Sequence, residues 1–129
     1  MEKKHMKHIN APKAPPALGP YSAAVQVDKL LFLSGQTPLD PLTGNVVEND
    51  IKVQTERVIL NLQAVLEAAG SSLQNVVKTT CFLTDMAHFA AFNEVYGRYF
   101  TGKPARSTVA VKALPKDALA EIELIAVVP

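Results

Sequence analysis

Residues 76–83, Val-Val-Lys-Thr-Thr-Cys-Phe-Leu, have the β-branched and aromatic enrichment that is typical of a strand. The segments on either side of this stretch show a different pattern. Residues 51–69 and 85–101 carry apolar side chains at the 3.6-residue period of an amphipathic helix. A strand flanked by two such helices indicates a fold in which both helices pack against one sheet.

The two predicted helices have recognisable start and stop signals. Asn49 or Asp50 can cap the first helix, and Gly70 can end it. Asp85 can cap the second helix, which should continue to about Thr101. Both helices are therefore bounded by residues that favour helix ends.

Further strands are predicted outward from these helices. Upstream, residues 22–27 and 30–33 read as two strands, with Gly35 ending the second. Downstream, residues 106–111 and 121–128 read as the last two. The predicted order is strand, strand, helix, strand, helix, strand, strand, which describes an α+β two-layer sandwich.

Chain length and composition predict one domain. The 129 residues suit a single core. Residues 1–13, within a stretch rich in Lys, His, Ala and Pro, are expected to form a flexible or extended lead-in, and residues 14–129 the domain. The apolar residues of 30–33 and 122–128 fall on both strand faces, so the face without helices also needs cover. A second copy of the chain is the simplest cover, which predicts a homo-oligomer.

The charge pattern and the cysteine content exclude several functional classes. Of the 13 Lys and Arg residues three lie in the first ten positions, and the remaining chain is close to neutral, which argues against nucleic-acid binding. Cys81 is the only cysteine, so no internal disulfide can form, and a cytoplasmic location is expected. We find no signal peptide and no apolar run long enough to span a membrane. The common cofactor motifs are absent, so no cofactor is expected.

The segment Pro104-Ala105-Arg106-Ser107-Thr108-Val109 and the acidic strand Glu121-Ile122-Glu123 carry the candidate chemistry. Strand alternation places Arg106 and Thr108 on one face, and Glu121 shares a face with Glu123. A guanidinium, a hydroxyl and a carboxylate could then converge on a small carboxylate substrate. The alternative is a structural ion pair between Arg106 and one of the two glutamates, and spacing alone favours it.

Two other residues, Tyr21 and Asn93, have two open interpretations, and Cys81 has one favoured interpretation. Tyr21 follows Gly19-Pro20 at a rigid corner, where it can serve a site or a core or interface. Asn93 is polar among aromatic residues and can bond a ligand or a loop. Cys81, in the middle of a strand, is expected to be a buried and inert thiol.

Several short motifs, taken together and in order, resemble the RidA family of reactive-intermediate deaminases, also called the YjgF family. They cover almost the whole chain from Asn10 onward. The motifs are Ala14-Pro15-Pro16-Ala17-Leu18-Gly19-Pro20-Tyr21-Ser22, Ser34-Gly35-Gln36 with Pro38, Pro41 and Gly44, Asp85 through Phe89 with Asn93 and Tyr96, Pro104-Ala105-Arg106-Ser107, and Leu114-Pro115-Lys116 with Glu121-Ile122-Glu123.

The resemblance implies a fold, an assembly and a reaction. The expected fold is chorismate-mutase-like, in a homotrimer whose sheets face inward and whose three clefts lie between subunits. Similar members hydrolyse 2-imino and 2-enamino acids, such as 2-iminobutanoate and 2-iminopropanoate, to 2-oxo acids and ammonia without a cofactor. Small 2-imino and 2-oxo carboxylates are therefore the expected ligands.

Residue roles follow from the same resemblance. Arg106 would hold the substrate carboxylate, and Glu121, kept ionised by the nearby Arg106, would activate or orient the attacking water. Tyr21 would close the cleft from one side. Gly35, Asn93 and the backbone around Thr108 would complete the pocket.

The sequence departs from the family pattern at a few positions. Thr108 stands where many members have Cys, so a thiol mechanism fails there, while a backbone carbonyl or a water held by the hydroxyl remains possible. Ala23 stands where Gln is common, and the link 101–103 is short. These differences bear on substrate range. The competing functions are a regulatory trimer that binds small carboxylates without catalysis and, with less support, a ribonuclease or translation inhibitor.

Overall fold

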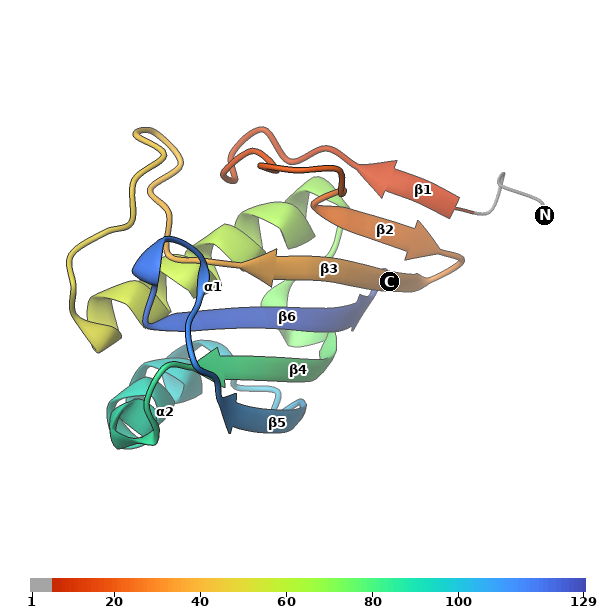
Figure 1. The fold of residues 1–129 in the computed structure, drawn as a ribbon. Helices are drawn as coiled ribbons and strands as arrows, with labels where there is room; N and C mark the ends of the chain where they lie inside the picture. The colour runs from red at the N-terminus through yellow and green to blue at the C-terminus, as the bar shows by residue number, and fades with distance from the viewer. Residues whose placement is uncertain (1–5) are drawn as a thin grey trace.

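The computed structural model describes residues 6–129, which form one mixed sheet with two α-helices on one of its faces (Figure 1). Residues 1–5 of the predicted lead-in lie outside the described residues. The sheet has six strands in the order β1-β2-β3-β6-β4-β5. The elements are β1 Met6–Ile9, β2 Ala24–Val27, β3 Leu30–Gln36, α1 Ile51–Ala68, β4 Val76–Leu83, α2 Phe89–Tyr99, β5 Ala105–Ala110 and β6 Ala120–Val127.

The predicted order of elements from residue 22 onward is confirmed, and so is the α+β class. Two details differ. The lead-in contributes an edge strand, β1, which pairs antiparallel with β2, whereas only a flexible or extended segment was predicted there. Strand β3 continues through Gly35 to Gln36 instead of ending at Gly35, and its register with β6 shifts between Leu33 and Gln36. This irregularity matters because it lies beside the candidate site.

Helix α1 begins at the predicted residue and ends at Ala68, one residue before the predicted end. The Asp50 side chain accepts a hydrogen bond from the Val53 amide at 3.0 Å, which satisfies one of the free donors of the first turn. Gly70 follows the helix with φ of 79°, a conformation that glycine adopts without steric cost. The helix packs on β3 and β6.

Helix α2 is preceded by a short 3₁₀ turn and ends earlier than predicted. Asp85 caps the turn by accepting from the Ala87 amide at 2.8 Å. The helix stops at Tyr99 because Phe100 leaves helical geometry and Lys103 adopts a φ of 54° ahead of Pro104. This tight link returns the chain to β5, which pairs parallel with β4.

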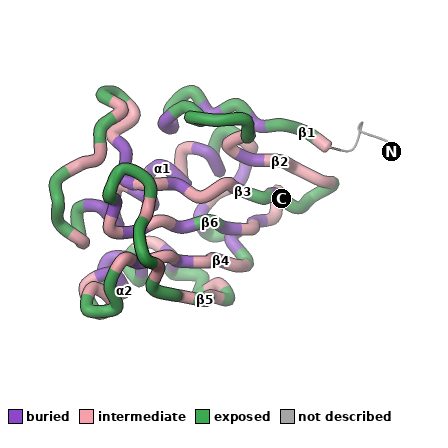
Figure 2. The backbone as a smooth tube through the Cα atoms, in the orientation of Figure 1, coloured by how far each residue is buried: buried purple, intermediate pink, exposed green. Residues whose placement is uncertain are grey.

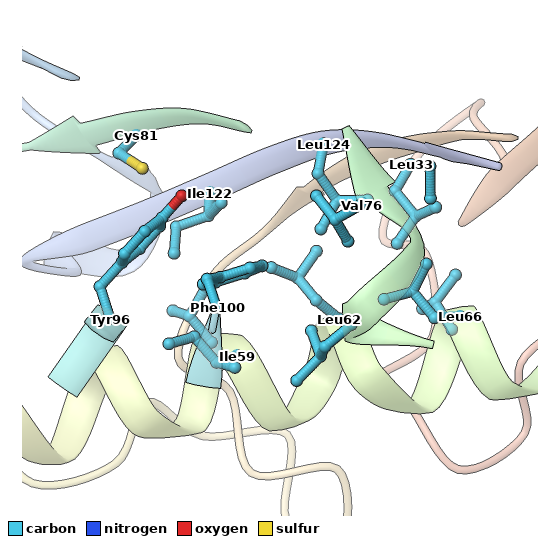
Figure 3. Close-up of a cluster of buried hydrophobic side chains, with 14 of the residues drawn as sticks. Leu33, Ile59, Leu62, Leu66, Val76, Cys81, Tyr96, Phe100, Ile122 and Leu124 are labelled. Carbon is cyan, nitrogen blue, oxygen red and sulfur yellow. The ribbon is translucent and has the colours of Figure 1, made fainter. Parts of the chain in front are cut away.

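The core lies between the helices and one face of the sheet (Figures 2 and 3). Burial alternates along β6, where Ile122 and Leu124 are buried and Glu123 is exposed. On the face without helices, Leu30 and Phe32 remain 45% and 42% exposed. Neither helix within residues 6–129 combines the length and apolar character needed to cross a membrane.

Candidate functional site in two halves

Arg106 lies on the edge strand β5 and faces helix α2. Its Nη1 donates a hydrogen bond to Oδ1 of Asn93 at 2.7 Å. Its guanidinium carbon lies 4.8 Å from the ring centre of Tyr96 and 5.4 Å from that of Phe89. These distances are within the range of cation–π attraction. The guanidinium is therefore held in place by one amide oxygen and two aromatic rings.

A cavity of about 530 Å³ opens beside this guanidinium. It lies between the second half of α2, the link that follows and the start of β5. The lining residues are Asn93, Tyr96, Gly97, Phe100, Thr101, Lys103, Pro104 and Arg106. Two cations and an amide on an otherwise largely apolar wall suit a small organic anion.

Thr108 follows Arg106 on the same face of β5, as predicted. Arg106 pairs in register with the buried Thr79 and Thr108 with the buried Cys81, so both face the helices. The Thr108 hydroxyl oxygen is buried and has no hydrogen-bond partner within residues 6–129. A buried hydroxyl without a partner is costly, and a ligand or water could satisfy it. The thiol of Cys81 is buried, as predicted, and burial raises its pKa, which keeps it unreactive.

Glu121 is the centre of a second group of residues, on the opposite face of the sheet. Its neighbour Ile122 points into the core, so alternation turns Glu121 away from the helices. Gly35 of β3 lies directly against the carboxylate, and a β-carbon added at position 35 would overlap Oε2 of Glu121. The glycine is therefore what allows this carboxylate to lie against the β3 backbone.

A second cavity of about 530 Å³ includes Glu121 and reaches the N-terminal segment. Tyr21 contributes to its wall and is 53% exposed, which excludes a core role within this chain. The remaining lining comes mainly from residues 15–18, 34–37 and the turn at Pro115 and Lys116. The full set is Pro15, Pro16, Ala17, Leu18, Tyr21, Ala23, Ser34, Gly35, Gln36, Thr37, Leu39, Pro115, Lys116, Glu121 and Glu123.

The surroundings of Glu121 raise the pKa of its carboxyl group. Burial is the main cause, and the negative charge of Glu123 adds to it. We had expected a neighbouring Arg106 to keep Glu121 ionised, and within one chain this expectation is wrong. A raised pKa makes the Glu121 carboxylate a stronger base than an exposed glutamate, which suits a group that exchanges protons with a ligand.

The structure does not bring Arg106 and Glu121 together within one chain. They lie on opposite faces of the sheet, and strand β4 separates β5 from β6. The alternative of a structural ion pair with Glu121 or Glu123 is also wrong for residues 6–129, because Arg106 bonds Asn93 instead. The candidate residues therefore form two groups rather than one: a candidate half-site called the arginine half, with Asn93, Arg106 and Thr108, and one called the glutamate half, with Tyr21, Gly35 and Glu121.

Phe89 and Tyr96, whose rings lie beside Arg106, were not among the predicted site residues. Their signal was present, because positions 89, 93 and 96 recur at the spacing of one helix face. Aromatic residues at that spacing are read first as core. Within the described residues no group of three His, Cys, Asp or Glu side chains could hold a metal ion.

Comparison with known proteins agrees with this architecture. The family model described as endoribonuclease L-PSP matches residues 11–128. Protein DfrA of Myxococcus xanthus is 55% identical, over 98% of this chain and 99% of its own. The mouse 2-iminobutanoate/2-iminopropanoate deaminase is 48% identical, over 94% of this chain and 90% of its own.

Solved structures share this fold. YyfA of Yersinia pestis, a protein of the conserved Rid family, superposes with a TM-score of 0.93 at 49% identity, covering 95% of this chain and 99% of its own. A family match over nearly all of the sequence, with relatives near half identity, leaves no ambiguity about descent. The chain belongs to the RidA/YjgF family, the family of the endoribonuclease L-PSP model.

Proposed function

We propose that this protein hydrolyses 2-imino acids, such as 2-iminobutanoate and 2-iminopropanoate, to 2-oxo acids and ammonia. The observation that carries the proposal is the state of Arg106: its guanidinium is fixed, yet within residues 6–129 no carboxylate neutralises it. A guanidinium fork matches the two oxygens of a carboxylate. The 48% identity to the mouse imine deaminase supports the same substrate class.

We propose further that the catalytic site forms between subunits of a homotrimer. In one chain the clamp and the acid–base group face opposite sides of the sheet, so neither half can complete the reaction alone. The exposed apolar residues Leu30 and Phe32 on the open face supply a surface for a second copy to cover. The arginine half of one subunit would then meet the glutamate half of its neighbour.

The reaction needs little from the protein beyond position and proton transfer. Arg106 holds the substrate carboxylate, and the protonated imine carbon is already electrophilic. Water adds to that carbon while Glu121 takes one of its protons, which gives a neutral carbinolamine. Glu121 then returns the proton to the amino group. The C–N bond breaks as the carbonyl forms, and the departing ammonia takes up the hydroxyl proton and leaves as ammonium.

The other residues of the two halves have supporting roles. Tyr21 closes the glutamate half on one side, and Gly35, which has no side chain, leaves room for the Glu121 carboxylate. Asn93 orients the clamp through its 2.7 Å bond to Arg106. The Thr108 hydroxyl, which has no hydrogen-bond partner within residues 6–129, is suited to hold the attacking water or a substrate oxygen.

The direct test generates imines in the assay from L-threonine or L-serine with a pyridoxal-dependent dehydratase and follows 2-oxo acid release. Wild-type protein should accelerate release, and Arg106→Ala should not. Acceleration by neither, from a folded oligomer, would contradict the proposal.

Subunit mixing tests where the site forms. Arg106→Ala and Glu121→Ala should each be inactive as pure trimers. Random mixing of the two variants rebuilds one intact site in each mixed trimer, so about one quarter of the wild-type sites should return. A site within one chain would recover nothing, because every chain carries one defect.

A second candidate function, binding without catalysis, is favoured by the separation of the two halves within one chain. The arginine half alone could bind a 2-oxo acid, so a regulatory trimer without turnover is the alternative. Binding of 2-oxobutanoate with no deamination of authentic imines would favour it. Ribonuclease activity is the third alternative, and RNA cleavage that is lost in Arg106→Ala would support it.

A further inference from the structure

Three residues of α2 form one stripe that faces Arg106. Phe89, Asn93 and Tyr96 are spaced by four and three positions, which places them on one side of the helix. Asn93 accepts a hydrogen bond from the guanidinium at 2.7 Å, and the ring centres of Tyr96 and Phe89 lie 4.8 Å and 5.4 Å from its carbon. The contact is thus a feature of one helix face rather than of scattered residues.

This stripe leaves the charge of Arg106 intact. An acidic partner would also fix a guanidinium, but it would neutralise the charge and compete with an anionic ligand. The partners here are two aromatic rings, which attract the cation through their π faces, and one neutral amide. Only one N–H is used within residues 6–129, so the other donors of the fork stay available for a carboxylate.

Tyr96 is the most firmly held member of the stripe. Its hydroxyl shares a buried hydrogen bond of 2.7 Å with the Thr79 hydroxyl, and Thr79 is the register partner of Arg106 on β4. Its ring stacks on Phe100, with centroids 4.4 Å apart. Figure 3 shows Tyr96 reaching from its helix toward the sheet near Cys81. The ring is therefore anchored at the sheet and at the helix.

We propose that Tyr96, locked by Thr79, is a positioning residue for carboxylate binding by Arg106. Together with Phe89 its ring sets the orientation of the guanidinium and leaves the positive charge for a 2-imino or 2-oxo monocarboxylate. The substrate class rests on the proposed function. The orientation of Arg106 by the two rings does not depend on that function. An experiment can therefore reject the deaminase function and still support the role of Tyr96, or the reverse.

The test compares Tyr96→Leu, which removes the ring, with Tyr96→Phe and Thr79→Val, which keep the ring and remove the hydroxyl bond. Tyr99→Phe is the matched control, because it removes a tyrosine hydroxyl from the same helix, bonded to Glu56 and away from Arg106. The readouts are the Kd for 2-oxobutanoate by calorimetry, kcat and KM for imines, and the NMR signal of the Arg106 Nε–H group.

Tyr96→Leu should raise Kd and KM by about tenfold, as expected for loss of a desolvated cation–π contact, while kcat changes by less than about threefold. The Arg106 Nε–H signal should move toward that of a free arginine. Tyr96→Phe and Thr79→Val should each weaken binding by about twofold to threefold, and the double variant no further, because both remove the same bond. Tyr99→Phe should match wild type.

Phe89→Leu keeps the test valid if Tyr96→Leu does not fold. It removes the other ring from a half-buried position and should raise Kd by about threefold to tenfold. The proposal is overturned if ring removal from a folded protein leaves Kd, KM and the Arg106 signal unchanged, if kcat alone falls, or if wild-type protein binds no 2-oxobutanoate. If the wild-type protein does not turn over imines, but ring removal still raises the Kd for 2-oxobutanoate and shifts the Arg106 Nε–H signal, only the deaminase function is rejected.

Discussion

The two candidate half-sites surround their ionisable groups in opposite ways. Arg106 is surrounded by neutral groups that attract a cation, so its charge is held in place and not cancelled. Glu121 is surrounded by groups that disfavour its charge, since burial and Glu123 both raise its pKa. A permanent cation suits binding, and a carboxyl group with a raised pKa suits proton transfer.

The two halves also depend on different parts of the chain. The arginine half is mostly local, because α2, its short link and β5 follow one another in the sequence. The glutamate half is assembled from distant segments, with Tyr21, Gly35 and Glu121 brought together by the sheet. Substitutions in the two halves should therefore affect different kinetic constants: binding in the first and turnover in the second.

Among substitutions that leave Arg106 and Glu121 themselves unchanged, the largest effect is expected at Gly35. In Gly35→Ala the new β-carbon overlaps the Glu121 carboxylate, which must leave its position against β3. Because general acid–base catalysis contributes about 10²–10⁴-fold, we expect kcat for imine hydrolysis to fall by about 10²-fold. Binding of 2-oxobutanoate should change by less than about threefold, because the arginine half is intact.

Gly102→Ala provides the matched control. A β-carbon at position 102 meets only ordinary contacts with Gln74, and Gly102 itself lines neither of the two cavities. Its kcat and KM should equal those of the wild-type protein. An unchanged kcat in Gly35→Ala would show that the position of Glu121 does not matter for turnover.

A smaller effect is expected at Asn93, on binding. Asn93→Asp keeps the shape of the side chain but places a carboxylate on Nη1 of Arg106, which neutralises the clamp. We expect KM to rise by about tenfold, and more than in Asn93→Ala, which removes the bond but leaves the charge. If Asn93→Ala is the worse variant, orientation and not free charge limits binding.

The sequence predicted the faces of individual strands but not their positions in the sheet. Alternation correctly placed Arg106 with Thr108, and Glu121 with Glu123. It could not show that β4 inserts between β5 and β6, because a period of two relates residues of one strand and says nothing about its neighbours. A convergence of the three groups within one chain, which strand alternation had left possible, does not occur for this reason.

Local signals explain the other successes and failures. The caps at Asp50 and Gly70 and the strand 76–83 depend on nearby residues, and the structure confirms them. Strand β1 was missed because Met6–Ile9 is short and its two apolar residues, at its ends, do not alternate with polar ones; it is held by pairing with β2. The contact of Gly35 with Glu121 could not be predicted either. It lies at a register shift between β3 and β6, which are neighbours in the sheet but far apart in the sequence.

The smallest expected effect is on stability, and it tests the state of Glu121. Since the folded-state pKa is raised, ionising this group costs stability: the cost is absent below its unfolded pKa of about 4.3, grows as pH rises toward the folded pKa and is constant above it. Glu121→Gln removes the cost. At pH 7 and fixed protein concentration its Tm should exceed that of wild type by about 1–3 °C, reduced because the group is only partly buried. At pH 4 the two melting temperatures should coincide, and a lower Tm for Glu121→Gln at pH 7 would mean that an unseen cation, such as the partner's arginine half, stabilises the carboxylate in the assembled protein.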